Sequence, residues 1–211
     1  MQYTNLYSFP VLPLMLVNTK TPRSTAEQVS NVKALLSNYE EITQLMLQAI
    51  DKITLEALEI IRNNQFEDEA NHTSLIRLGE LIRINHGLLV SLGVSHPRLE
   101  RIRELVDHTG IGWTKLTGAG GGGCSITLLK PGIKEAVKAG LNRTLDSEGF
   151  ERYETELGGD GVGVLWPAVV DGEEITQEMF LNAEGVDGVE SLVGVKAIGD
   201  VNGWRFWRLP E

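Results

Sequence analysis

Apolar residues in the first half of the chain are spaced for one strand followed by several helices. Residues 11–19 are rich in Leu and Val and predict a strand, with Pro10 and Pro13 marking its start or an edge position. Beyond Ser24, a good helix N-cap, apolar residues recur at the spacing of amphipathic helices. Helices are expected over residues 25–37, 39–63, 72–92 and 97–108.

Two of these helices carry apolar stripes that should face a core. In the helix over residues 39–63 the stripe begins with Ile42 and Leu45. In the helix over residues 72–92 it includes Asn85, which we expect to be a satisfied buried polar group or a helix–helix contact. The neighbouring His86 either borders a ligand cleft or, more simply, lies at the surface.

The pattern changes at Trp113, where short apolar runs begin to alternate with glycines. Strands are expected over residues 113–117 and 125–130, a helix over residues 132–147, and two further strands near residues 151–156 and 162–166. Glycines 158, 159 and 161 predict a hairpin turn between the last two strands.

Residues 167–211 differ in composition from the rest of the chain. The segment contains nine acidic and three basic side chains, which gives it a net charge of −6 over 45 residues. Short alternating pieces at Ser191–Ile198 and Trp204–Arg208 are candidate strands. We interpret this segment as an acidic C-terminal extension that packs on the main domain or is partly disordered.

Composition and charge disfavour some classes of binding partner and indicate a cellular compartment. The net charge of −10 and the pI of about 4.9 disfavour binding of nucleic acid or anionic membranes over the general surface. Cys124 is the one cysteine, so no intramolecular disulfide can form, and no signal sequence or membrane span is evident. We therefore expect a cytoplasmic protein. The four histidines lack a metal-ligand pattern, and no metal site is expected.

The segment that points to chemistry is the glycine run between residues 118 and 123, which follows Lys115 and Thr117 and ends at Cys124. Glycines in such density indicate positive φ angles or a close approach of the main chain to another group. Successive N–H groups in such a loop can line a site for an anion, either a phosphate or another loop. The alternative is a tight turn without a ligand. The run has no GK[ST] ending and matches neither a Walker loop nor a dinucleotide fingerprint.

The segment Lys115–Cys124, Lys-Leu-Thr-Gly-Ala-Gly-Gly-Gly-Gly-Cys, resembles the third motif of the GHMP kinases, in the form found in mevalonate kinases of fungal type. Three further segments resemble the same family in order and spacing. They are Asn18–Thr25 as the strand and turn after the active-site domain, Leu81–Pro97 as the long helix and turn, and Glu154–Val162 as the last hairpin. The resemblance covers about residues 9–166 and predicts a GHMP C-terminal domain over residues 1–166, with residues 167–211 as an extension of unknown role.

The resemblance implies an α+β fold, a ferredoxin-like sandwich with additional long helices. It also implies a kinase of isoprenoid and sterol biosynthesis that transfers the γ-phosphoryl group of ATP to the 5-hydroxyl of mevalonate, with Mg²⁺ as cofactor. Both substrates would lie in a cleft between this domain and an N-terminal domain. The residues expected to contact the nucleotide are Gly118, Ala119, Gly120, Gly121 and Gly122.

Four flanking residues are candidates for the substrate side of the cleft, each with a plain structural alternative. Ser24 and Thr25 either reach the substrate or simply cap a helix. Lys115 either faces the cleft or is a solvated strand lysine, and Thr117 flanks the loop. Arg23 either contacts a phosphate or pairs with a surface acid. Cys124, with no histidine near it in the sequence, is expected to be a buried small residue that starts a strand.

No catalytic residue is expected in this chain. The family's Gly-Ser-Ser phosphate loop, Mg²⁺ carboxylate and catalytic Asp and Lys lie in the N-terminal domain, and no Pro-x-x-x-Gly-Leu-Gly-Ser-Ser-Ala segment is found here. The chain alone should therefore be inactive and bind neither ATP nor Mg²⁺ tightly. Its expected partners are that N-terminal domain and a second copy of itself, through an apolar cleft face. The alternative is a stand-alone ferredoxin-like module that binds a small molecule or regulates a partner without catalysis.

Overall fold

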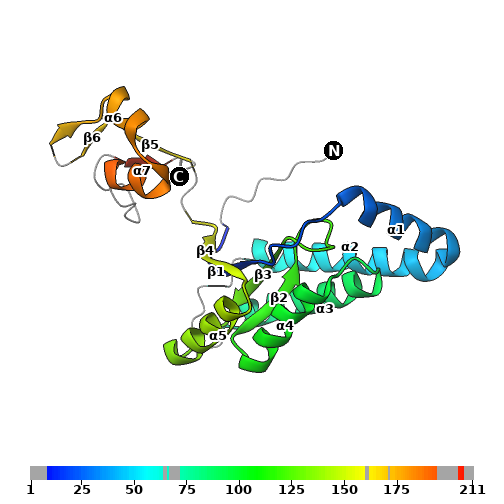
Figure 1. Cartoon of the computed structure of the whole chain (residues 1–211). Coiled ribbons are helices and arrows are strands. Elements are labelled where there is room, and N and C mark those ends of the chain that lie inside the picture. Colours follow the sequence, from blue (N-terminus) through cyan, green and yellow to red (C-terminus); the bar gives the residue numbers. More distant parts are fainter. Residues whose placement is uncertain are drawn as a thin grey trace. The chain divides into compact units, whose positions relative to one another are not determined.

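The computed structural model describes residues 9–63, 66, 72–159, 162–170, 172–193 and 204–206. The chain divides into two compact units, Met1–Leu157 and Gly158–Glu211. Figure 1 shows the helices and strands of both units. Among the described residues, no helix combines the length and the apolar character that crossing a membrane requires.

Each strand and helix predicted before residue 157 is present in the first unit. In chain order the elements are β1 (Leu12–Asn18), α1 (Thr25–Asn38), α2 (Glu40–Arg62), α3 (Thr73–Ser91), α4 (Pro97–Thr109), β2 (Gly112–Leu116), β3 (Cys124–Leu129), α5 (Glu135–Ser147) and β4 (Glu151–Leu157). The expected boundaries hold to within three residues.

The four strands form one antiparallel sheet in the order β2-β3-β1-β4. In this order the first strand of the chain is central, and Met15 lies opposite Thr127 on β3 and Glu154 on β4. Helices α1 to α4 connect β1 with β2, and α5 connects β3 with β4. The predicted α+β class is therefore confirmed.

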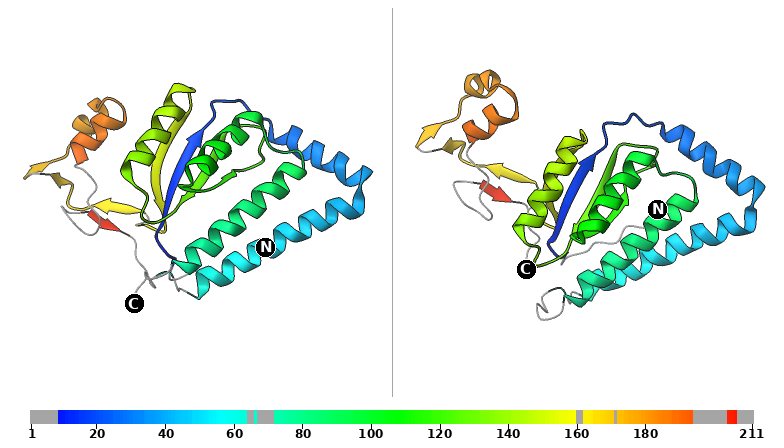
Figure 2. Two further views of the ribbon diagram at one scale, coloured as in Figure 1. Left: turned by 90° about the horizontal axis from the view of Figure 1, so that it is seen from below. Right: turned by 60° about the horizontal axis from the view of Figure 1, so that its bottom comes forward.

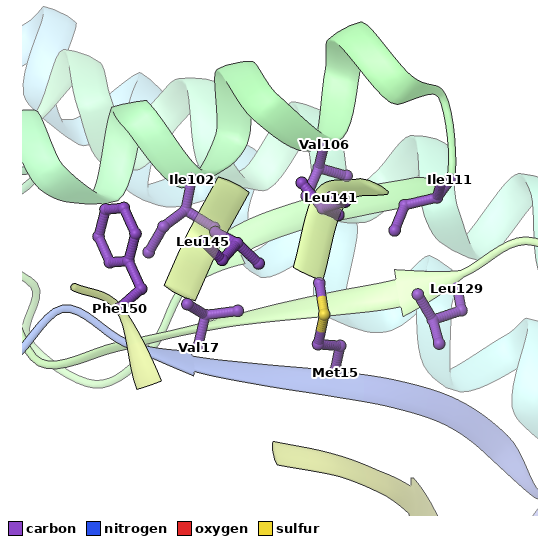
Figure 3. Close-up of a cluster of buried hydrophobic side chains, with 9 residues drawn as sticks. All are labelled: Met15, Val17, Ile102, Val106, Ile111, Leu129, Leu141, Leu145 and Phe150. Carbon is purple, nitrogen blue, oxygen red and sulfur yellow. The ribbon is translucent and has the colours of Figure 1, made fainter. Parts of the chain in front are cut away.

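One face of the sheet packs against α4 and α5. Met15 and Val17 are fully buried on β1 and point toward Leu141 and Leu145 of α5, as Figure 3 shows. These side chains belong to a cluster completed by Ile102, Val106, Ile111, Leu129 and Phe150. Removal of this apolar surface from water is the main source of stability for the unit.

Helices α2 and α3 cover part of the opposite face. Leu12, Leu128 and Trp113 of the sheet pack with Leu75 and Leu78 of α3. A Cβ atom at Gly79 of α3 would overlap the ring of Trp113, so glycine lets this helix approach the sheet.

The first half of α2 runs beside α1 and away from the strands (Figure 2). The expectation that its apolar stripe faces a core is wrong for this half, because Ile42 and Leu45 are 61% and 64% exposed. The buried residues of α2 are Thr43 and Ile60. The neighbour of this half is α1, which has no buried residue and offers no deep core.

The second unit contains short elements. They are β5 (Gly163–Leu165), β6 (Val169–Val170), β7 (Glu173–Glu174), α6 (Gln177–Asn182), α7 (Gly185–Val193) and β8 (Trp204–Phe206). β5 pairs with β8 and β6 pairs with β7, both in antiparallel fashion. The two helices were not predicted.

Two sequence predictions for this part of the chain are corrected. The predicted hairpin between β4 and β5 is wrong, because β4 pairs with β1 while β5 pairs with β8. The predicted strand at Ser191–Ile198 is wrong over Ser191–Val193, which ends α7, and its remainder lies outside the described residues. The strand predicted at Trp204–Arg208 is confirmed over Trp204–Phe206, and its last two residues also lie outside them.

Candidate functional site

The glycine run forms the loop between β2 and β3, which we call the glycine loop (residues 117–123). Thr117 closes it, since its N–H and its Oγ1 both donate to the carbonyl oxygen of Cys124, at 3.1 and 2.8 Å. Five positions have positive φ, namely Gly118 (63°), Gly120 (80°), Gly121 (71°), Gly122 (135°) and Gly123 (69°). Ala119 is not among them, so the residue types follow the backbone conformation of the loop.

The middle of the loop rests on the turn between α3 and α4. The N–H of Gly121 donates to the carbonyl oxygen of Val94 at 2.8 Å. A Cβ atom at Gly120 would overlap that same oxygen. Close approach of two main chains is therefore a second reason for glycine here.

The end of the loop is bonded to the turn between β1 and α1. Thr19 donates its N–H to the carbonyl oxygen of Gly123 at 2.8 Å, and the N–H of Gly123 donates to the carbonyl oxygen of Thr21 at 3.2 Å. Arg98, at the start of α4, supports this turn through its Nε, which donates to the carbonyl oxygen of Thr19 at 3.0 Å. The side chain of Gln28 on α1 lies against Gly121. Segments from three parts of the sequence thus meet at the glycine loop.

Several N–H groups of the loop have no acceptor among the described residues. In the part of the chain that the structure describes, no hydrogen bond is found for the N–H groups of Gly118, Ala119 and Gly122, whereas the N–H of Gly120 closes a turn on the carbonyl oxygen of Thr117. Gly118 and Ala119 are consecutive. Such a run of unpaired N–H groups provides partial positive charge that can bind an anion.

Arg23 adds a full positive charge at the same place. Its Nη1 lies 3.5 Å from the carbonyl oxygen of Thr117, and its guanidinium would be in van der Waals contact with a Cβ atom at Gly118. The side chain is exposed, and none of the ion pairs among the described residues involves it. The predicted alternative, pairing with a surface acid, is thus not observed within that part of the chain.

Ser24 and Thr25 follow Arg23 at the start of α1, and both are exposed. The Oγ of Ser24 accepts a hydrogen bond from the N–H of Glu27 at 3.2 Å, which confirms the helix-capping alternative for this residue. Thr25 is the first residue of the helix.

Lys115 and Cys124 lie at the strand ends that flank the loop. Lys115 is half-buried, its Nζ donates to the carbonyl oxygen of Leu116 at 3.0 Å, and burial lowers the pKa of this lysine. It is therefore not the fully solvated strand lysine of the alternative. Cys124 begins β3, as predicted, but it is half-buried and not buried as expected, and its thiol is free.

The structure changes the interpretation of one group near the loop and adds another that the sequence did not single out. His86 is buried, so its interpretation as a surface histidine was wrong. Its Nδ1 accepts from the N–H of Leu116, the residue before the loop, at 3.2 Å. Asn85 beside it is half-buried. The Val94 carbonyl was missed because a backbone acceptor has no side-chain signature. The available signal was the turn Leu92–Pro97, which carries the family resemblance.

Acidic and metal-binding groups do not gather at this place. Among the residues that the structure describes, no set of three or more His, Cys, Asp or Glu side chains is arranged to hold a metal ion. The described part of the site therefore offers N–H groups and one guanidinium, which suit a phosphate or a carboxylate as ligand.

The family model for the C-terminal domain of GHMP kinases matches residues 66–147, which include the glycine loop. The chain is 55% identical over 212 residues to the mevalonate kinase of Aspergillus fumigatus, covering 97% of this chain and 39% of that protein. It is 53% identical over 216 residues to the mevalonate kinase of Gibberella zeae, covering 98% of this chain and 42% of the relative. The chain thus spans about two fifths of the length of these relatives.

A solved structure with a similar fold is that of L. major mevalonate kinase in complex with R-mevalonate. The match has a TM-score of 0.58 at 24% identity and covers 72% of this chain and 44% of that one. At this identity the likeness concerns the fold. It adds a three-dimensional match to the matches in sequence.

Proposed function

This chain carries the C-terminal domain of the GHMP kinase family, and from that premise we propose that it forms one wall of the nucleotide site of a mevalonate kinase. The proposed reaction transfers the γ-phosphoryl group of ATP to the 5-hydroxyl of mevalonate, in isoprenoid and sterol biosynthesis. Identities of 55% and 53% to two mevalonate kinases support this substrate over those of other GHMP kinases. The sheet order β2-β3-β1-β4 supports the ferredoxin-like description of the domain.

The observation that carries the proposal is the run of unpaired N–H groups beside Arg23. Phosphoryl transfer relies on positioning and on charge that stabilises the phosphate oxygens. In the proposed site the N–H groups of Gly118 and Ala119 bind the nucleotide phosphates, with the main chain of Gly120 and Gly122 beside them, and Arg23 adds a cation. Gly121 anchors the loop, since its N–H is already bonded to Val94.

The remaining groups of the site are proposed to come from the upstream part of the complete enzyme. ATP arrives with Mg²⁺, which lowers the charge of the phosphates, and the described part of this chain offers no acidic cluster for that ion. Ser24, Thr25, Lys115 and Thr117 are proposed to border the substrate side of the cleft. We place the enzyme in the cytoplasm, a reducing compartment that suits the free thiol of Cys124.

A chimeric enzyme tests the proposal. The upstream part of the A. fumigatus relative is joined to this chain, and ATP-dependent phosphorylation of mevalonate is measured. Turnover by the chimera, with none by the isolated chain, is the expected result. The matched variant Arg23→Gln should lower kcat/KM by at least about tenfold, the usual effect of removing one charged contact to a phosphate. A folded chimera without turnover, or an isolated chain that turns over rapidly, would contradict the proposal.

The alternative function is that of a stand-alone module, which binds a small molecule without catalysis. It predicts that the isolated chain binds a small molecule with micromolar or better affinity and gains no kinase activity in the chimera. Calorimetric titration with ATP and with mevalonate distinguishes the two, because the half-site should bind both only weakly.

Self-association is a further part of the proposal, and it rests on the exposed apolar face of α1 and α2. Val29, Tyr39, Ile42, Leu45 and Leu47 are between 40% and 64% exposed there. Apolar surface of this kind favours association. Light scattering at increasing concentration should show oligomers that Leu45→Glu weakens, and a clean monomer at all concentrations would argue against it.

A further inference from the structure

His86 lies inside the first unit with both ring nitrogens engaged. Its side chain is 3% exposed. The N–H of Leu116 donates to Nδ1 at 3.2 Å, and Nε2 lies 2.9 Å from Oε1 of Glu100 on α4. Because a backbone N–H can only donate, Nδ1 has to be the unprotonated nitrogen of a neutral ring. The ring proton is then on Nε2 and is donated to Glu100.

Glu100 joins this histidine to two other donors. The Oγ of Ser95, in the turn between α3 and α4, donates to Oε1, and the Nε of Arg103 donates to Oε2 at 3.1 Å. We call these four side chains, His86, Ser95, Glu100 and Arg103, the His86–Glu100 cluster. Hydrogen bonds of this cluster connect the carboxylate of Glu100 on α4 to α3 and to the turn after α3. Through His86 they also reach the end of β2.

The cluster is linked to the glycine loop at two places, through Leu116 and through Val94. Leu116 directly precedes Thr117, which closes the loop. Ser95 directly follows Val94, whose carbonyl oxygen holds the N–H of Gly121. A movement of the imidazole would therefore shift the first residue of the loop and the support under its middle together.

We propose that the His86–Glu100 cluster is a positioning device for the glycine loop, in which neutral His86 holds the loop in its anion-binding conformation and protonated His86 releases it. The inference rests on the proposed function for the identity of the anion. The link between cluster and loop is set by hydrogen bonds within this chain. No member of the cluster touches the nucleotide in this scheme, so His86 acts through Leu116 and through Val94.

Burial of His86 favours its neutral form over the attraction of Glu100. Burial lowers the pKa of His86 below its ordinary value of 6.5, the charge and hydrogen bond of Glu100 raise it, and Arg103 of α4 and Lys115 of β2 lower it further. A protonated ring would carry an N–H at Nδ1, facing the N–H of Leu116. The hydrogen bond to Leu116 would then be replaced by repulsion between two donors.

The experiment uses the whole 211-residue chain and needs no nucleotide. Long-range ¹H–¹⁵N spectra report the tautomer of His86, and amide hydrogen exchange is followed at Leu116 and Gly121 between about pH 7.5 and about pH 5. The variants are His86→Gln, which keeps a donor and an acceptor but does not titrate, and His86→Leu, which keeps neither. His108→Gln, at an exposed histidine of α4, is the matched control.

The proposal predicts an Nε2–H tautomer and loop amides that shift with the same midpoint as the imidazole in the wild-type chain. His86→Gln should abolish that titration with near-native shifts at neutral pH, and His86→Leu should speed exchange at Leu116 and Gly121 about tenfold. His108→Gln should match the wild type. If His86→Leu fails to fold, Ser95→Ala, which removes one donor to Glu100, should give a smaller increase at Gly121.

Two outcomes would overturn the inference. One is a loop that titrates in His86→Gln as it does in the wild-type chain. The other is a loop whose exchange is unchanged in both His86→Leu and Ser95→Ala. Either outcome leaves the kinase proposal standing, because the chimera is judged by turnover. A chimera without turnover would in turn leave the link between cluster and loop intact.

Discussion

At Gly120 the chain has no room for a side chain. Its φ of 80° disfavours other residues, and a Cβ atom would overlap the carbonyl oxygen of Val94. Gly120→Ala should therefore lower the free energy of unfolding by about 2 kcal/mol or more, measured by urea denaturation. Gly132→Ala is the matched control, because its φ of 68° is similar and nothing lies near the added Cβ. Equal effects of the two substitutions would show that the contact with Val94 is unimportant.

His86 makes stability depend on pH in a definite direction. Because its pKa in the folded chain is lowered from 6.5, the unfolded chain takes up the proton first as the pH falls. The contribution of neutral His86 is complete above pH 6.5 and is lost as the pH falls below it toward the folded-state pKa. Urea denaturation at about pH 7.5 and about pH 5 should show a smaller loss of stability in His86→Gln than in the wild-type chain. An equal loss in both would refute this assignment.

The sequence predicted the backbone conformation of the glycine loop better than the contacts that surround the loop. The run from Gly118 to Gly123 indicated positive φ or close approach, and both are found. The sequence could not predict that the carbonyl of Val94 supports the loop, because a main-chain acceptor is the same in every residue type. His86 was misjudged because its partner, the N–H of Leu116, lies 30 residues further along the chain.

At the level of elements, two leucines on helices test where the core lies. Leu145 of α5 is fully buried against β1, while Leu45 of α2 is 64% exposed. Leu145→Ala should destabilise the chain by about 2–5 kcal/mol, since it leaves a cavity in the core. Leu45→Ala should change stability by no more than about 0.5 kcal/mol. Thermal unfolding of the two variants, at a concentration where the chain is monomeric, measures the contrast. A large effect at Leu45 would mean that α2 is buried in solution.

Helical periodicity located the helices of the first unit but not what each one contacts. The spacing that begins with Ile42 and Leu45 shows which face of α2 is apolar, and it carries no information on whether a sheet lies beneath that face. The same limit explains the wrong hairpin after β4. Glycines 158 and 159 signalled a turn, but β4 pairs with the distant β1, where Tyr153 lies opposite Leu16, and β5 pairs with β8. Pairing between such distant segments leaves no local mark on the sequence.

For the whole molecule, the α+β class and the order of elements up to residue 157 followed from the pattern and from the family resemblance. The helices α6 and α7 of the second unit did not, because at six and nine residues they are too short for a periodic signal. The acidic composition of residues 167–211 described their surface and said little of their fold. Composition reports which class of partner a segment disfavours, whereas folding depends on which apolar side chains meet.

The division of the chain into two units predicts where it can be shortened. The core beneath the sheet runs from Met15 to Phe150, and β4 is the last element that pairs with this sheet. A chain ending at Leu157 should therefore fold, with amide shifts for residues 12–150 that overlay those of the whole chain. A chain ending at Phe150 should unfold or aggregate, because it loses β4 and leaves β1 as an exposed edge along seven paired positions. If the chain ending at Leu157 gave a collapsed spectrum, the first unit would depend on residues beyond it.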